Sequence, residues 1–144
     1  MKEIKTLKTL LNILAIIVII FGGMNFYNNR NSMTLLSNIV FILIFMATLV
    51  VIYKLKKITD TVRNRNMFIE RNRKNFQEIG YIFLFIAVIS CFWESNSMSI
   101  INLFSVFAIR LETLILVILS LLAFILSHVF YEAYKLKEEN KLTI

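Results

Sequence analysis

Long runs of apolar residues, separated by short polar stretches, fill most of the chain. Two of them, residues 10–27 and 33–53, contain no charged residue. Because an α-helix rises about 1.5 Å per residue and the hydrocarbon core of a bilayer is about 30 Å thick, runs of this length predict membrane-spanning helices. A tyrosine ends each run and Lys54 follows the second, a combination that is typical of a membrane edge.

The second half of the chain contains two more spans with less regular boundaries. Residues 79–93 are few for a crossing, so we expect this helix to draw in polar residues from its flanks. The apolar region that follows is interrupted by Arg110 and Glu112, whose charges are costly at mid-bilayer. We therefore place the fourth span at residues 113–131. Residues 100–109 should lie at the outer surface, as a short interfacial amphipathic helix or a re-entrant segment.

The polar loop at residues 54–78 also has helical periodicity. Its apolar residues recur three or four positions apart, which extends the second helix beyond the membrane and begins the third helix before it. We expect a helical hairpin that projects from the bilayer, with its turn at residues 63–66. Asn66 is the expected N-cap of the following helix, and Glu70 should lie in its first turn.

Composition supports the same class. Apolar residues make up 58% of the chain and its mean hydropathy is +0.75, well above soluble proteins. The expected fold is an all-α integral membrane protein, with four transmembrane helices forming a four-helix bundle in one domain, residues 1–144. No room is left for a separate catalytic or nucleic-acid-binding domain, so we expect no direct contact with nucleic acid.

Positive charge predicts the topology. Of the 16 lysines and arginines, 14 lie in residues 1–8, 54–74 and 135–141, and the other two are Arg30 and Arg110. Lysine and arginine accumulate in cytoplasmic loops during insertion. We therefore expect a multi-pass protein of the bacterial cytoplasmic membrane, with both termini and the central loop in the cytosol.

The basic central loop has two interpretations. It can bind anionic lipid headgroups, at about 1 kcal/mol per cation near the surface, or dock a cytosolic protein. Lipid binding is the simpler interpretation, because the topology alone already requires these cations. The sequence leaves open whether copies of the chain associate.

Catalytic chemistry has little support. The chain has one histidine, His128, and one cysteine, Cys91, too few for a cluster of metal ligands. Only Glu94 and Glu112 could form a pair of carboxylates at the outer face. We therefore expect no enzymatic activity, no metal and no cofactor.

Polar residues inside the spans are expected to hold the bundle together through hydrogen bonds between helices, at about 0.6 kcal/mol each. They are Asn12, Ser37, Asn38, Thr48, Ser90, Ser120 and Ser127. Gly22 and Gly23 are a candidate site of close approach between helices.

Two short patterns resemble a known family. The spacing F-x3-N-x-K-x-L-x2-I-G occurs in the central loop, at Phe68, Asn72, Lys74, Phe76, Ile79 and Gly80. The end of the chain is similar to L-x-E-E-N-x-L-T-I, with fixed positions at Glu138, Glu139, Asn140 and Thr143. Both patterns resemble those of the bacterial domain-of-unknown-function 2975 family of small four-helix membrane proteins. Members of that family have proline where this chain has Met67, and more often leucine where it has Phe76.

The resemblance implies a partner, since genes of this family often lie beside a small helix-turn-helix repressor of the Cro type. The expected function is therefore to sense a signal at the membrane and to bind or restrain such a regulator. Glu138 and Glu139 form the only adjacent acidic pair on the expected cytosolic side, so they are candidates for docking on a basic DNA-binding protein.

An alternative is immunity, because small basic multi-span proteins also protect cells against membrane-acting bacteriocins or toxins. In that case the outer residues 100–109 would face the toxin. A neighbouring helix-turn-helix gene favours the regulator, and a neighbouring toxin gene favours immunity. A channel or transporter subunit has less support, because nothing inside the spans marks an ion pathway.

Overall fold

The computed structural model describes residues 2–29, 34–63, 68–92, 99–103 and 107–142. The elements are α1 (Lys2–Asn29), α2 (Leu35–Arg63), α3 (Glu70–Phe92), β1 (Ser99–Leu103), β2 (Phe107–Arg110) and α4 (Leu111–Leu142). All four helices are long and apolar enough to cross a membrane, which confirms the prediction of four helices of this kind.

The helices are longer than the apolar runs that predicted them. Helix α3 begins at Glu70, nine residues before the apolar run at Ile79, so it draws in polar residues at its start as expected. Helix α4 has 32 residues and reaches Leu142. At about 1.5 Å per residue it is about 48 Å long, which exceeds the hydrocarbon core by about 18 Å.

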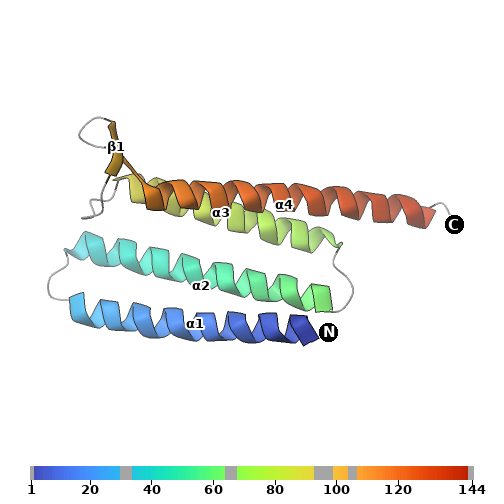
Figure 1. Cartoon of the computed structure of the whole chain (residues 1–144), viewed down its shortest axis with the longest axis horizontal. Coiled ribbons are helices and arrows are strands. Elements are labelled where there is room, and N and C mark those ends of the chain that lie inside the picture. The colour runs from blue at the N-terminus through green and yellow to red at the C-terminus, as the bar shows by residue number, and fades with distance from the viewer. Residues whose placement is uncertain (1, 30–33, 64–67, 93–98, 104–106, 143–144) are drawn as a thin grey trace. The chain divides into compact units, whose positions relative to one another are not determined.

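The chain divides into two compact units, Met1–Met67 and Phe68–Ile144. In the first unit, α1 and α2 lie side by side and antiparallel (Figure 1). Thr34 precedes α2, and its hydroxyl accepts a hydrogen bond from the backbone N–H of Ser37 at 3.3 Å. A threonine in this position is an N-cap, which explains why the helix begins at Leu35.

Polar contacts between α1 and α2 lie toward the start of α1. Lys8 Nζ forms an ion pair with Asp60 Oδ1 at 2.7 Å, and Lys56 Nζ donates to Asn12 Oδ1 at 2.9 Å. Farther along, a Cβ at Gly22 would overlap the ring of Phe45, so glycine permits close approach there.

The second unit contains the other antiparallel helix pair, α3 and α4, and a two-stranded sheet between them in sequence (Figure 1). Two hydroxyls of α4 donate to backbone carbonyls of α3. Ser120 Oγ donates to Gly80 O at 2.8 Å, and Ser127 Oγ donates to Arg73 O at 3.0 Å. The prediction that Ser120 and Ser127 link helices is therefore confirmed.

These two hydrogen bonds are seven residues apart on both helices. The contact between the helices therefore recurs every two turns. A seven-residue repeat of contacts is typical of two helices that cross at a small angle. One more step of seven leads to Thr113 and Ala87, which are 4% and 2% exposed. Among the described residues, the Thr113 hydroxyl has no hydrogen-bond partner.

Several other polar residues within the spans do not link helices in this way. The hydroxyls of Thr48 and Ser90 donate to carbonyls of their own helices, at Ile44 and Ile86. This local bond is available to any serine or threonine whose hydroxyl reaches the carbonyl four residues back. The Ser37 hydroxyl bonds to that of Thr34.

The prediction of an outer interfacial helix at residues 100–109 is wrong. Strands β1 and β2 pair antiparallel, with Ser99 opposite Arg110 and Leu103 opposite Phe107, and an irregularity in the register after Ser99. The β-branched isoleucines of this segment favour extended backbone. Pairing of the strands also satisfies the backbone hydrogen-bonding groups on their facing edges.

The polar loop is largely helical, because α2 continues to Arg63 and α3 starts at Glu70. Glu70 lies in the first turn of α3, as predicted. The expected N-cap Asn66 lies outside the described residues, and α3 begins four residues after it. The pairing of α2 and α3 into a projecting hairpin stays a prediction, as does the single membrane domain.

Candidate functional site

A groove of about 360 Å³ lies between α3 and α4 in the second unit. It is open on one side, and none of its lining residues is acidic. The lining residues are Arg73 and Gln77 from α3, and Phe124, Ser127, His128 and Tyr131 from α4. The groove is polar at one end and apolar at the other.

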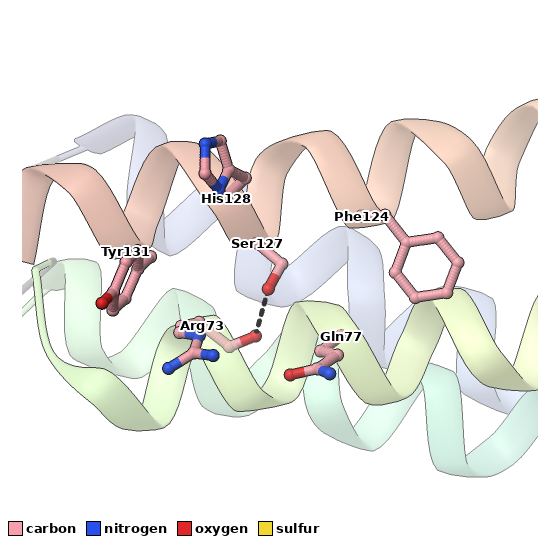
Figure 2. Close-up of a pocket in the computed structure, with 6 residues that line it drawn as sticks. All are labelled: Arg73, Gln77, Phe124, Ser127, His128 and Tyr131. Atoms are coloured by element: carbon pink, nitrogen blue, oxygen red, sulfur yellow. Dashed lines mark hydrogen bonds between the residues drawn. The ribbon is translucent and has the colours of Figure 1, made fainter.

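The Arg73 side chain is held at the polar end of this groove. Its guanidinium carbon lies 4.5 Å from the centre of the Tyr131 ring, which is a cation–π contact. The backbone at Arg73 is fixed as well, because its carbonyl accepts the hydrogen bond from Ser127 (Figure 2). Among the described residues, no carboxylate lies within ion-pair distance of the Arg73 guanidinium.

The other lining residues continue the groove along the helices. Gln77 lies one turn after Arg73, and its amide nitrogen is 3.4 Å from the Tyr81 hydroxyl. Figure 2 shows Tyr131, Ser127 and Phe124 pointing from α4 toward α3, while His128 points away from α3. Tyr131 and Gln77 therefore line the groove beside Arg73, and the Phe124 ring lines its apolar end.

Three residues of the central-loop motif pack α3 against α4. The rings of Phe68 and Phe76 lie 6.0 and 5.1 Å from the ring of Phe130, measured between centroids. A Cβ at Gly80 would lie 2.8 Å from the Phe124 ring, so the absence of a side chain makes room for that ring. The structure thus brings Phe68, Phe76 and Gly80 to one helix interface.

The two polar residues of the motif have different surroundings. Asn72 is fully buried and takes part in an interaction within the chain. Lys74 is exposed and pairs with Glu70 at 3.0 Å, one turn earlier on the same helix. A polar residue at 0% exposure is a packing and hydrogen-bonding residue rather than a surface contact.

The acidic end of the chain lies on α4. Glu138, Glu139 and Asn140 lie within the helix, and each already takes part in an interaction within the chain. Thr143, the remaining predicted site residue, lies outside the described residues. The structure does not bring this end of α4 and the groove together, since Tyr131 and Glu138 are seven residues apart on the helix.

Sequence reasoning missed Phe124 and Phe130, the two rings that receive the motif residues. Apolar residues occur on every side of α4, so hydropathy does not distinguish the face that meets α3 from the lipid face. The useful signal was the spacing of small polar residues. Thr113, Ser120 and Ser127 recur every seven positions and mark one face of the helix.

Among the described residues, no three histidine, cysteine, aspartate or glutamate side chains gather as a metal site would require. Cys91 is a free thiol with intermediate exposure.

A model of the family described as "Protein of unknown function (DUF2975)" matches residues 25–144. Neither a comparison with curated proteins nor one with solved structures found a match.

Proposed function

The chain belongs to the DUF2975 family of proteins of unknown function, and we propose that it is a non-enzymatic protein of the bacterial cytoplasmic membrane that binds and restrains a small helix-turn-helix regulator. Four apolar helices support the multi-pass placement. The even number of crossings and the charge distribution of the loops favour cytosolic termini.

One observation carries the proposal: α4 continues without interruption past its apolar part. The eleven residues after Tyr131, as far as Leu142, extend it by about 16 Å at about 1.5 Å per residue. A continuous helix projects its side chains at fixed positions, whereas a loose tail would not. On this proposal, Glu138 and Glu139 lie on a helical arm that extends beyond the hydrocarbon core.

Charge exchange explains how such an arm would bind a regulator. Glu138 and Glu139 already interact within the chain, so a partner must replace those contacts with its own cations. A DNA-binding surface offers several arginines and lysines, and it would bind the arm in competition with DNA. The interaction should therefore weaken with salt and should lower occupancy of the operator.

The test uses the full chain in membrane vesicles, mixed with the purified helix-turn-helix protein encoded beside its gene. We expect the regulator to sediment with the vesicles and to be released by operator DNA. The single variants Glu138→Lys and Glu139→Lys should each reduce the bound fraction about fivefold, a typical effect of reversing a charge at a docking surface. Glu132→Lys, an exposed acidic residue on the same helix near Tyr131, is the matched control and should retain binding.

Two results contradict the proposal. Equal binding by wild type and both tail variants would exclude the acidic arm as the docking surface. Absence of any regulator on the vesicles, together with protection of cells against a membrane-acting bacteriocin, would favour immunity. The β1–β2 hairpin, at the opposite end of α4 from the arm, is the element that such a toxin would meet.

A further inference from the structure

The groove between α3 and α4 is located where a membrane-crossing helix pair passes from hydrocarbon to headgroups. Tyr131 ends the apolar part of α4, and Arg73 lies six residues before the apolar run of α3 begins at Ile79. The hydrogen bond from Ser127 to Arg73 O places these two helices in register at this level. Arginine and tyrosine are the residues expected at headgroup depth.

The polar end of the groove is a donor site for an oxyanion. The Arg73 guanidinium uses its face for the Tyr131 ring, 4.5 Å away, which leaves the N–H groups at its edge for a ligand. The Tyr131 hydroxyl lines the same groove and adds a further donor, whereas the Gln77 amide nitrogen is directed to the Tyr81 hydroxyl, 3.4 Å away. Arginine forms paired hydrogen bonds with phosphate oxygens through its planar fork.

The other end of the groove is apolar and lies deeper in the span. Phe124 is seven residues from Tyr131, so it lies about 10 Å farther along α4. Its ring packs edge to face on the Tyr81 ring, with 5.1 Å between the ring centroids, and it lies against Gly80. A ligand that fills the groove must therefore present an anion at one end and an apolar chain at the other.

We propose that this groove binds the phosphate of an anionic phospholipid, with the acyl chain along Phe124. The amphipathic order of the lining residues selects a lipid over free phosphate, because free phosphate would leave the apolar end uncovered. This site is separate from the general attraction of the basic loop for the membrane surface, since it depends on one held arginine. It is also independent of the regulator proposal.

The experiment is native mass spectrometry of the full chain, released from mixed micelles that contain equal amounts of phosphatidylglycerol and phosphatidylcholine. Wild type should bind the first phosphatidylglycerol about tenfold more tightly than phosphatidylcholine. A difference in affinity of this size is expected from one charge-assisted hydrogen bond. Arg73→Gln should bring the two affinities within about twofold of each other. Arg73→Lys keeps the charge but loses the fork, so it should retain about a third of the preference.

Arg71→Gln is the matched control, because Arg71 is exposed, lies on the same helix and does not line the groove. It should leave the preference unchanged. Circular dichroism must show the same helix content in all variants, and Arg73→Lys provides the test if Arg73→Gln does not fold. The proposal is wrong if Arg73→Gln and Arg73→Lys keep the full preference, or if Arg71→Gln removes as much of it. Displacement of the lipid by an equal concentration of inorganic phosphate would instead show a site for a free anion.

Discussion

The two helix pairs of this protein are held together in different ways. Between α3 and α4, hydroxyl-to-carbonyl hydrogen bonds at Ser120 and Ser127 alternate with packed aromatic rings along the helices. Between α1 and α2, an ion pair and a lysine-to-amide hydrogen bond lie toward one end of α1. The apolar side chains of α1 are mostly exposed.

The difference shows where specificity comes from in a membrane. Lipid tails are as apolar as leucine, so burying apolar surface does little to choose a partner helix. Close packing and polar contacts supply that choice, and the second pair has both at several levels along its helices. The first pair has a close approach at Gly22 and polar contacts toward the start of α1, while the apolar side chains of α1 are mostly exposed. We therefore expect substitutions between α3 and α4 to have the larger effects.

The largest effect should come from filling the close approach at Gly80. Gly80→Leu would place its side chain against the Phe124 ring, since even a Cβ would lie 2.8 Å from that ring. Overpacking of this kind costs about 1 to 3 kcal/mol, and we expect the upper end because Gly80 is buried. The measurement is the free energy of unfolding in a titration with sodium dodecyl sulfate, followed by circular dichroism.

Gly23→Leu is the control for this prediction. Apart from its chain neighbours and its own helix backbone, no atom lies within 4 Å of a Cβ at Gly23, so a leucine there should be tolerated. If Gly80→Leu and Gly23→Leu lower the stability equally, the proposed difference between the two helix pairs is wrong.

A second prediction compares adjacent glycines of α1. Alanine favours a helix over glycine by about 1 kcal/mol, so Gly23→Ala should stabilise the protein by up to that amount. Gly22→Ala should lose that gain and more, because its Cβ overlaps the Phe45 ring. The midpoints of the same titration should separate the two variants by about 1 to 2 kcal/mol. Identical midpoints would mean that α1 does not pack on α2 at Gly22.

The two helix pairs also differ in how much of their packing the pattern of the sequence can predict. The charge-free run at residues 33–53 was enough to predict α2, because only a helix satisfies its backbone in hydrocarbon. The prediction of a close-approach site at Gly22 and Gly23 is confirmed, and the structure places the approach at Gly22. Glycine permits close approach, but which glycine faces the neighbour depends on the rotation of the helix.

The candidate groove was less accessible to prediction than the helices. Arg73 was counted among the topology-setting cations, and its contact with Tyr131 joins residues 58 positions apart. Such a contact depends on the register between α3 and α4, which the serines at positions 120 and 127 establish. The β1–β2 hairpin was missed because its short apolar run fits a surface helix and a strand equally well.

A third prediction tests the hydroxyl links directly. The double variant Ser120→Ala and Ser127→Ala removes two hydrogen bonds between α3 and α4, and it should cost about 1 kcal/mol in total. Thr48→Ala removes a hydroxyl that bonds only to the Ile44 carbonyl of its own helix, so its effect should be near zero. Equal losses from the two changes would show that the links between helices add nothing beyond local bonding.

The smallest effect should come from the ion pair of the first helix pair. Asp60→Asn removes the partner of Lys8, whose side chain is 32% exposed against 45% for Asp60. Pairs with this exposure contribute about 0.5 kcal/mol, and salt screens them. The loss should therefore be measurable at low ionic strength and disappear in high salt. Glu70→Gln is the matched control, since it breaks a pair within one helix. Asp60→Asn and the double serine variant could also lower the free energy of unfolding equally. In that case one polar contact at a helix end would hold α1 on α2 as firmly as several contacts along the helices hold α3 on α4.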